Sequence, residues 1–406
     1  MATNNLKGNS SVRQCSPVPM RQCSPVRKKP SIEYSDAEIS IATTKSFSAD
    51  NGTQTHNKPS MPQTNSAPIP YPKNTRHLIP RPKVKRKKVK YMDWRRYHKL
   101  SVIYAFIDDL ERDYPAICTV YVIGKSIEGR DIKMLKISNS DASNSSVWVD
   151  GAIHPREWIT AAVVTFIAEN IVKAFNSLST SMTNKDWHIV PVLNPDGYEY
   201  SHTKDRMWRK NRASYDGNCV GVDLNRNFSF GWGHNGEEGS SEEPENIFYR
   251  GPTPFSEPET AAVRDYILGS PNQFKVFLSF HSYFEMIIFP WGFKKDPCPD
   301  YLNQMEAGMR MAKAIYDYSG ITYKVGCTKD LTYYACGTSV DWSYGIANIP
   351  YSFMIELRSR KYKFRLPRDQ IFDTCMESWC AIKSLMDYVD NPSYPLHKYT
   401  QRKSTK

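Results

Sequence analysis

Two short segments carry residue types that can hold a metal ion. His154 and Glu157 lie in AIHPREW (152–158), between an apolar run and a helical pattern. An imidazole and a carboxylate separated by two residues in such a turn can face one ion from the same side. His281, near the end of the apolar run VFLSFHS (276–282), is the best candidate for a third ligand. Two histidines and one carboxylate, with one position left for water, form the donor set of a catalytic zinc site.

Each of these signals alone has a more ordinary explanation. Most H-x-x-E tetrads are surface polar residues, and a lone histidine in an apolar run is more often a core residue. Glu356 adds to the pattern because it follows a largely apolar run, where a carboxylate is costly to bury without a partner or a task. A buried ion pair with Arg358 is the structural alternative for Glu356. Further polar candidates in apolar surroundings are Arg209, Asp223, Asn225, Arg226 and Tyr333.

The segments around these residues alternate between strand and helix patterns. The last three strand-length runs are too continuously apolar for a sheet with one wet face. Interleaved strands and helices predict an α/β fold, a three-layer α/β/α sandwich with a central mixed sheet, and strand ends are where such sheets place their sites. Strand runs occupy 118–124, 131–137, 147–151, 187–193, 276–282 and 351–357. Helical patterns occupy 93–115, 157–175, 256–268 and 368–388. At the start of the third helix, SEPET forms a capping box with Ser256 as N-cap and Glu259 at the third helical position.

The first 90 residues differ in composition from the rest. They hold 17 Lys and Arg, 4 Asp and Glu, and 11 of the 27 prolines. Such a stretch cannot bury enough apolar surface to offset its ordering entropy, so a disordered basic tail is expected over 1–90. Its last run, RPKVKRKKVK (81–90), could contact a polyanionic partner, and a solvated linker is an equally good interpretation. One domain is expected from 91 to 406, with a short flexible end from about residue 391.

Cysteine usage and hydropathy exclude several classes of protein. The nine cysteines are an odd number without a CxxC pair, which indicates neither a disulfide scaffold nor a cysteine-ligated zinc site. The N-terminal stretch has no apolar core typical of a secretory signal, and no run of 18 apolar residues occurs. The sequence therefore predicts no membrane span.

Taken together, the motifs resemble those of the zinc metallocarboxypeptidases typified by pancreatic carboxypeptidase A. The resemblance runs from about Asp93 to Tyr388, and the common order of many widely spaced motifs makes it very specific. The motifs are H-x-x-E at 154–157, NPDGY at 194–198, RMWRK at 206–210, CVGVDLNRNF at 219–228, FLSFHSY at 277–283, SVDWSYG at 339–345 and IELR at 355–358.

The resemblance implies an exopeptidase that hydrolyses the C-terminal peptide bond of peptides and proteins. His154, Glu157 and His281 would bind one Zn²⁺ per chain, and the metal would activate a water molecule. Glu356 would act as general base towards that water and then deliver the proton to the leaving amine. Arg209 would stabilise the oxyanion that forms on the scissile carbonyl.

The resemblance also assigns residues to the substrate. Asn225 and Arg226 would hold the terminal carboxylate, which an internal residue of a peptide cannot offer. Tyr333 would close over the bound residue, although a register error of one step would give this role to Tyr334. Arg156 and Tyr283 fall at subsidiary substrate positions, and Asp223 matches the carboxylate that orients the first zinc histidine.

The specificity pocket is expected to be neutral. Relatives that prefer basic C-terminal residues carry an acidic residue where this chain has Val340. The other positions expected there are Ile288, Gly292 and Met354, which are apolar or small. A pocket without a counter-charge should reject Lys and Arg and prefer aliphatic or aromatic side chains.

The chain departs from secreted members of the family in three features. Residues 1–90 have the wrong composition for a folded propeptide, and no signal peptide is visible. Cys219 is expected to be a free thiol, because the stretch near Glu245 that would hold its disulfide partner has no cysteine. These departures favour an intracellular location over the secretion typical of the family. The alternative function is a catalytically silent carboxypeptidase-like binding module, localised by its basic tail.

Overall fold

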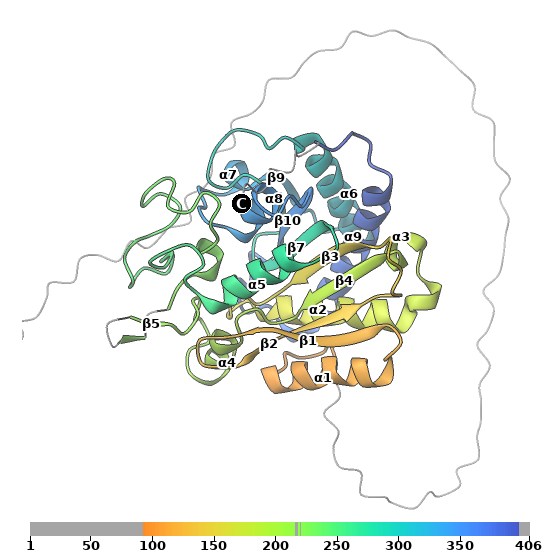
Figure 1. Ribbon diagram of the computed structural model, residues 1–406, viewed down its shortest axis with the longest axis horizontal. Coiled ribbons are helices and arrows are strands. Elements are labelled where there is room, and N and C mark those ends of the chain that lie inside the picture. Colours follow the sequence, from red (N-terminus) through yellow and green to blue (C-terminus); the bar gives the residue numbers. More distant parts are fainter. Residues whose placement is uncertain (1–91, 216–217, 220, 398–406) are drawn as a thin grey trace, which may run out of the picture. The chain divides into compact units, whose positions relative to one another are not determined.

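The computed structural model describes residues 92–215, 218–219 and 221–397 of the 406-residue chain. Its centre is an eight-stranded sheet with the order β1-β2-β4-β3-β7-β10-β8-β9 (Figure 1). The strands are β1 (Cys118–Lys125), β2 (Asp131–Ile137), β3 (Ser145–Asp150), β4 (Lys185–Val190), β7 (Phe274–Ser282), β8 (Met286–Phe289), β9 (Lys324–Cys327) and β10 (Tyr351–Leu357). A separate two-stranded ribbon joins β5 (Ser214–Tyr215) to β6 (Asn218–Cys219).

The sheet contains both parallel and antiparallel pairs. Its four middle strands, β4, β3, β7 and β10, are parallel neighbours, whereas β1, β2 and β4 pair antiparallel at one side and β8 pairs antiparallel with β10 at the other. Almost every residue of these middle strands is buried, as expected for strands covered on both faces. The predicted mixed sheet is confirmed, including the six strands expected from apolar runs.

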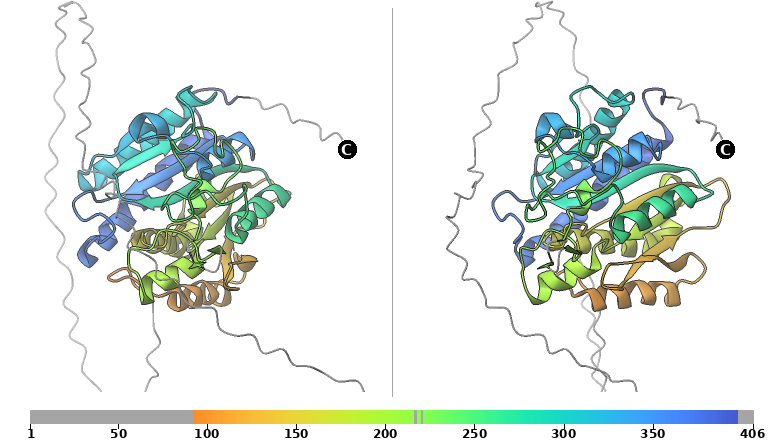
Figure 2. Two further views of the ribbon diagram at one scale, coloured as in Figure 1. Left: turned by 90° about the vertical axis from the view of Figure 1, so that its left-hand side faces the viewer. Right: turned by 60° about the vertical axis from the view of Figure 1, so that its left-hand side comes forward.

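Helices cover both faces of the sheet (Figure 2). The core of one face joins strand residues to α1, α2, α6 and α9, and the core of the other joins them to α5 and α8. The predicted three-layer α/β/α sandwich is therefore confirmed. The α-helices are α1 (Leu100–Asp113), α2 (Trp158–Ala174), α3 (Thr180–Thr183), α4 (Pro195–Thr203), α5 (Pro258–Gly269), α6 (Tyr301–Ser319), α7 (Thr328–Leu331), α8 (Ser339–Gly345) and α9 (Ile371–Asp390). Three 3₁₀ turns, η1 (Phe175–Ser177), η2 (Leu224–Arg226) and η3 (Arg368–Gln370), complete the described elements.

Helix α2 is the most apolar helix among the described residues. Its stretch Trp158–Ser177 is long and apolar enough to cross a membrane, but 67% of that window is buried inside the protein. Its side chains belong to the same core as β7 and α9. Helix α2 is therefore the central core helix of this face, and its N-terminus fixes the direction in which the preceding loop approaches the sheet.

The predicted start of α5 is wrong. Helix α5 begins at Pro258 with Glu257 as N-cap, and the Ser256 hydroxyl donates a 2.7 Å hydrogen bond to the Glu257 carboxylate instead of capping the helix. Glu259 accepts hydrogen bonds from Asn211 and from the backbone of Ile127, so its carboxylate does not reach back to the helix start. Tertiary partners therefore displaced the local capping pattern.

Some predictions lie outside the described residues. The tail expected over 1–90 and its polyanionic partner are among them, as is the side chain of Cys219. The limits of the two predicted domains stay predictions. Six of the nine cysteines have described side chains, and all six are free thiols.

Candidate metal and substrate site

Three parallel strands bring the candidate ligands to one edge of the sheet. His281 lies near the end of β7 and is the register partner of Glu356 on β10. The neighbouring strand β3 ends at Asp150, and the loop after it carries His154 and Glu157 into the first turn of α2, where Glu157 is the N-cap. Carboxyl ends of parallel strands meet at the same edge, which is why segments more than 100 residues apart in sequence converge here.

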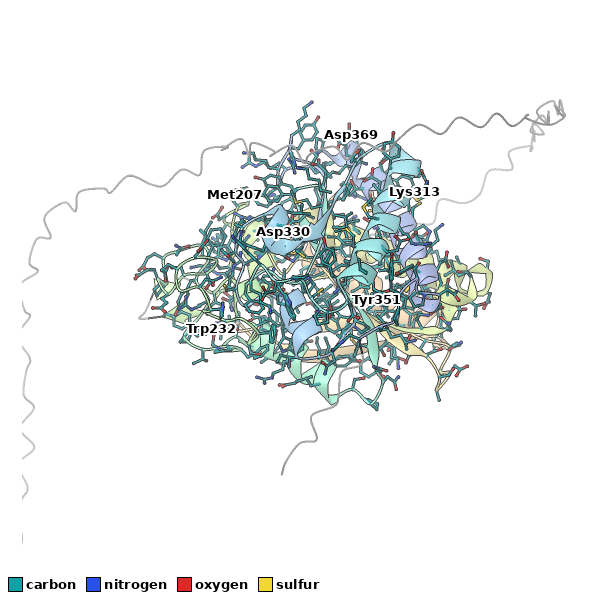
Figure 3. The ribbon with its side chains drawn as sticks, turned by 90° about the horizontal axis from the view of Figure 1, so that it is seen from above. Met207, Trp232, Lys313, Asp330, Tyr351 and Asp369 are labelled. Atoms are coloured by element: carbon teal, nitrogen blue, oxygen red, sulfur yellow. The ribbon has the colours of Figure 1, made fainter. Side chains whose placement is uncertain are left out.

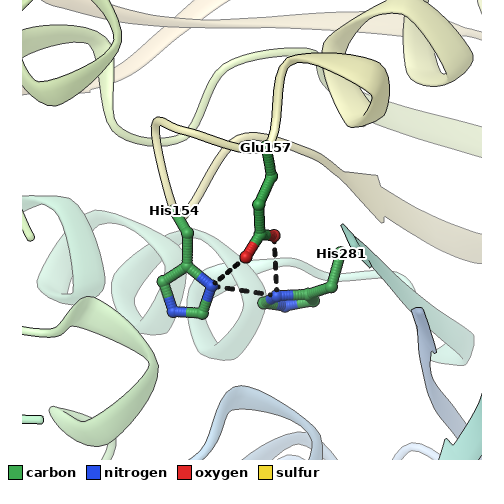
Figure 4. Close-up of side chains that lie close together, drawn as sticks. All are labelled: His154, Glu157 and His281. Atoms are coloured by element: carbon green, nitrogen blue, oxygen red, sulfur yellow. Dashed lines mark hydrogen bonds and ion pairs between the residues drawn. The ribbon is translucent and has the colours of Figure 1, made fainter. Parts of the chain in front are cut away.

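The three predicted metal ligands form one tight cluster (Figure 4). His154 Nδ1 lies 2.9 Å from Glu157 Oε1, and His281 Nδ1 lies 3.2 Å from both Glu157 Oε2 and His154 Nδ1. The candidate ligand atoms all lie within 4.8 Å of one another, and the side chains are at most 4% exposed. Among the residues that the structure describes, this is the one group of three or more such side chains with metal-binding geometry.

The Nε2 atom of each histidine also has a hydrogen-bonding partner. His154 Nε2 lies 3.1 Å from Asp223 Oδ1, and His281 Nε2 lies 3.2 Å from the Ser279 hydroxyl, which donates a 2.8 Å hydrogen bond to Asp150. With a metal bound, each Nε2 would carry the proton and each Nδ1 would present a lone pair to the ion. Two imidazole nitrogens and a carboxylate that converge in this way need either shared protons or a cation between them, so the donor set fits a metal ion.

The charges of the cluster suit metal binding. Burial alone would raise the pKa of Glu157, but the two histidines outweigh it and hold this pKa well below its usual range. Burial likewise opposes ionisation of Asp223, and Arg209 and His154 overcome it and lower the pKa. Burial lowers the pKa of His281, which favours the neutral imidazole that a metal requires. Glu157 is therefore a carboxylate at any physiological pH.

Glu356 lies beside this cluster, but its pKa is shifted in the opposite direction. Burial, and then the neighbouring charge of Glu157, raise its pKa to about 8. Its Oε2 atom is buried and has no hydrogen-bond partner. The alternative ion pair with Arg358 does not form, because the Arg358 guanidinium lies 3.3 Å from Glu377. An unpaired carboxyl group of raised pKa beside a metal-ligand cluster is suited to accept a proton from water.

The predicted carboxylate-binding residues lie next to this cluster. Arg226 is 2% exposed, donates to the Asn225 carbonyl and, at 3.3 Å, to the Tyr333 hydroxyl, and leaves its buried Nε without a partner. Asn225 accepts a hydrogen bond from the Ser339 backbone at 2.9 Å. Tyr333 is 48% exposed, whereas the Tyr334 ring lies under Lys329. The contact to Arg226 favours Tyr333 over Tyr334.

Arg209 is connected to the metal cluster through Asp223. Its Nη2 is 2.9 Å from Asp223 Oδ2, so one carboxylate holds both Arg209 and His154. Burial disfavours the charged guanidinium, yet the pKa of Arg209 is raised because Asp223 outweighs that cost. Arg209 is therefore a fixed cation at the edge of the cluster.

Arg156 and Tyr283, the predicted subsidiary substrate residues, both contact a third side chain. The Arg156 guanidinium carbon lies 4.0 Å above the centre of the Phe364 ring, and the Tyr283 ring centre is 4.7 Å from the same ring. Arg156 Nε is buried without a partner. These groups form an aromatic and cationic wall beside the cluster.

The predicted specificity residues gather in an apolar cluster. Val340, Ile288 and Met354 belong to one buried core, and Ile288 pairs with Met354 across β8 and β10. Gly292 allows a close approach, since a Cβ atom there would lie 2.6 Å from the Ala335 carbonyl oxygen. Met354 Sδ lies 3.6 Å from Asn225 Nδ2, which connects this cluster to the predicted carboxylate-binding residues.

Sequence reasoning missed several residues of the site. Asp150 and Ser279 follow the same signals that pointed to Glu356 and His281, since Asp150 ends an apolar run and Ser279 lies two residues before His281 on one face of a strand. Phe364 and Phe248 lie in loops and gave no such signal. The Phe248 ring centre is 5.1 Å from the Arg209 guanidinium and 5.4 Å from that of Arg226.

Comparison with known proteins identifies the family of the chain. A family model for zinc carboxypeptidases matches residues 103–381, which is more than half of the chain. The chain is 38% identical to carboxypeptidase B of Astacus astacus over 301 residues, which are 73% of this chain and 98% of that protein. It is 39% identical to a zinc carboxypeptidase of Simulium vittatum over 294 residues, which are 71% of this chain and 95% of that protein.

A solved structure supports the same assignment. The crystal structure of carboxypeptidase A from Helicoverpa armigera matches with a TM-score of 0.69 and 32% identity, and the match covers 75% of this chain and 78% of that one. The fold, the order of the motifs and the relatives agree. The chain belongs to the zinc carboxypeptidase family and is a zinc-dependent metallocarboxypeptidase that acts on peptides with free C-termini.

Proposed function

We propose that His154, Glu157 and His281 bind the zinc ion and that Glu356 is the general base of peptide-bond hydrolysis. When bound, zinc supplies Lewis acidity that activates water and polarises a carbonyl group. Glu356 accepts a proton from the attacking water and passes it to the nitrogen of the departing residue. The buried Oε2 of Glu356 without a partner and its raised pKa support this role.

Arg226 is proposed to select substrates by their terminal carboxylate. This buried guanidinium has no carboxylate within 4 Å among the described residues, and its Nε lacks any partner. A buried cation in that state favours an anion that enters with the substrate, and the planar fork can bind both carboxylate oxygens. This unpaired Arg226 is the observation that carries the proposal, because only the last residue of a peptide offers the missing anion.

Arg209 and Tyr333 complete the proposed chemistry. Arg209 is fixed by Asp223, and we propose that it stabilises the oxyanion that forms on the scissile carbonyl. Tyr333, which reaches Arg226 and is largely exposed, can close over the bound residue. Arg156 and Tyr283 are proposed to contact the residues that precede the cleaved bond.

An apolar C-terminal residue is the proposed preference. Val340, Ile288, Gly292 and Met354 offer no charge to a lysine or arginine side chain. Asp341 follows Val340 directly in the sequence and is the acidic residue nearest to it. It accepts hydrogen bonds from the backbone of Gly292 and Phe293, and burial raises its pKa to about 7. Its carboxylate is directed at the backbone, so aliphatic or aromatic side chains are favoured.

Hydrolysis of blocked dipeptides tests these assignments. The purified chain is assayed on substrates that end in Phe, Leu or Lys, with and without a chelator, beside Glu356→Gln. We expect chelator-sensitive release of Phe and Leu, weak release of Lys, and loss of release in the variant. Efficient release of Lys would refute the pocket assignment alone. Tight peptide binding without any release by the zinc-loaded protein would favour the catalytically silent binding module.

A further inference from the structure

The segment between β10 and α9 has an unusual charge. Residues 358–368, which we call the basic loop, read RSRKYKFRLPR and contain six Lys and Arg and no Asp or Glu. Residues 91–406 as a whole carry nearly equal numbers of basic and acidic side chains, so the basic loop departs from the average of the domain. A concentration of one sign in eleven residues therefore creates a local positive field.

Most of this charge is not neutralised inside the protein. Arg358 points inward to Glu377, and Arg360 lies 3.3 Å from Glu285. The remaining four basic side chains are exposed and form no ion pair with any residue that the structure describes. These are Lys361, Lys363, Arg365 and Arg368.

The basic loop reaches the substrate site through its central residue. Phe364 packs against Arg156 and Tyr283, the two residues proposed to contact the substrate ahead of the cleaved bond. Arg206 donates a hydrogen bond to the Phe364 carbonyl and a second one, of 2.6 Å, to the Arg156 carbonyl. Arg206 thus connects the basic loop to the wall formed by Arg156, Tyr283 and Phe364. The exposed charged side chains of the loop lie beyond that wall.

A second segment adds to the positive surface. Tyr97 donates a 2.8 Å hydrogen bond to the Leu366 carbonyl, which places the start of α1 beside the loop. Arg95 and Lys99 are exposed on that segment, whereas its one acidic residue, Asp93, already pairs with Arg96. Asp369, the first acidic residue after the loop, lies at the edge of the molecule in Figure 3. The balance of exposed charge over this surface is positive.

The path of a bound peptide follows from the same geometry. The terminal side chain enters the apolar pocket and its carboxylate meets Arg226, so the rest of the peptide must leave on the other side of the cleaved bond. In the proposed function, Arg156 and Tyr283 contact the peptide on that side, and Phe364 packs against both. Because an extended chain spans roughly 3.3 Å per residue, residues about three to six positions from the C-terminus can reach the basic loop.

We propose that the basic loop is a secondary substrate-binding surface that selects peptides with Asp and Glu upstream of the cleaved residue. The inference rests on the proposed function, since it uses the direction in which the substrate is bound. Exposed charges of this kind act mainly on encounter and on KM, and salt screens them. The partner class is therefore an acidic peptide segment that ends in an apolar residue.

Peptides that differ only upstream test the proposal on the full-length protein. Three substrates share the C-terminal sequence Ala-Phe-Leu, preceded by four Glu, four Gln or four Lys. At low ionic strength we expect kcat/KM for the Glu peptide to exceed that for the Gln peptide by about tenfold, with the Lys peptide lowest. The difference should reside in KM and shrink to about twofold or less in 0.5 M salt.

Two sets of variants locate the source of the preference. Lys361→Gln, Lys363→Gln and Arg365→Gln combined should bring the Glu to Gln ratio close to one. The control set, Arg310→Gln, Lys313→Gln and Lys383→Gln on α6 and α9, removes the same charge elsewhere and should retain the ratio. A Glu to Gln ratio that survives in the basic-loop variant would overturn the proposal, as would equal rates for the three peptides.

A blocked Phe-Leu dipeptide, which is too short to reach the basic loop, separates this proposal from the proposed function. Its hydrolysis together with equal rates on the long peptides would overturn the secondary surface alone. If the zinc-loaded protein leaves the dipeptide intact, both proposals are wrong.

Discussion

The proposed metal-binding half and the proposed substrate-binding half of the site adjoin each other at the ends of β3, β7 and β10, yet their polar atoms are paired differently. In the metal half, His154 and His281 each have one nitrogen directed at the cluster and one held by Asp223 or Ser279. In the substrate half, buried atoms of Glu356, Arg226 and Arg156 have no partner. A permanent cofactor can rely on donors that are already fixed, whereas a substrate that comes and goes must find its partners free.

Two neighbouring glutamates show the same contrast in their ionisation. Glu157 contacts both histidines, which hold its pKa well below the usual range. Glu356 lacks such contacts, and burial and the charge of Glu157 raise its pKa to about 8. One edge of the sheet thus carries a carboxylate that stays ionised, as the proposed ligand, and a second carboxylate that can exchange a proton.

Substitution of Glu356 should give the largest effect on activity. It should also distinguish most clearly between the substrate-binding half, which it changes, and the metal-binding half, which it leaves intact. We expect Glu356→Gln to lower kcat by about 10³-fold, because the amide cannot accept a proton, while KM changes little. Zinc content should remain at one ion per chain, since the metal half keeps all its donors. Steady-state kinetics and atomic absorption on the same sample measure both, with Glu306→Gln on α6 as the control. Loss of zinc from Glu356→Gln would show that metal binding depends on Glu356, so that the two halves do not act independently.

Removal of the unpaired cation tests the substrate half alone. Arg226→Gln should lower kcat/KM by about 100-fold, chiefly through KM, because the terminal carboxylate would lose a buried charged partner. Arg226→Lys keeps the charge but loses the two-pronged geometry, so an intermediate loss is expected. Kinetics on one blocked dipeptide compare the variants. An unchanged KM in Arg226→Gln would refute the assignment of this residue to the carboxylate.

A change in the metal-binding half should alter the affinity of the protein for zinc. Asp223→Asn is expected to weaken zinc binding by about 10- to 100-fold, because the amide holds His154 and Arg209 less firmly than a carboxylate does. Competition with a chelator of known affinity measures this change. Asp186→Asn replaces a similarly buried carboxylate on β4, far from the cluster, and should leave zinc affinity unchanged. Equal zinc affinity in wild type and Asp223→Asn would mean that the ligand geometry does not depend on Asp223.

The part of this site that sequence could predict is the part set by strand geometry. Apolar runs located β3, β7 and β10, and parallel strands of one sheet must end at a common edge, so His154, His281 and Glu356 could be expected to meet. The same reasoning would have included Asp150 and Ser279, because alternation along a strand places Ser279 on the face of His281. The identity of the chemistry came from the ordered motifs that resemble a known family.

Features set by tertiary contacts were not predictable in this way. The SEPET motif predicted a helix capped by Ser256, but Asn211, distant in sequence, engages both Glu257 and Glu259, and the N-cap lies one residue later, at Glu257. Phe364 and Phe248 lie in loops whose path depends on hydrogen bonds such as that from Arg206. No periodicity in the sequence encodes these contacts, so neither aromatic residue was assigned to the site.

The smallest expected effect concerns the stability of the zinc-free protein. The pKa of Glu356 is raised to about 8 in the folded chain from an ordinary value of 4.5. Between these two pH values the folded state binds a proton that the unfolded state has lost, so the contribution of Glu356 to stability falls as pH rises through this window. Glutamine does not titrate. The Tm of zinc-free Glu356→Gln relative to wild type should therefore increase between pH 5 and pH 8.5 by about 2–4 °C, as measured by calorimetry. Zinc should reduce this difference, because a nearby cation favours the carboxylate. A Tm difference that is independent of pH would mean that Glu356 is ionised throughout, like Glu157, and the contrast between the two glutamates would not hold.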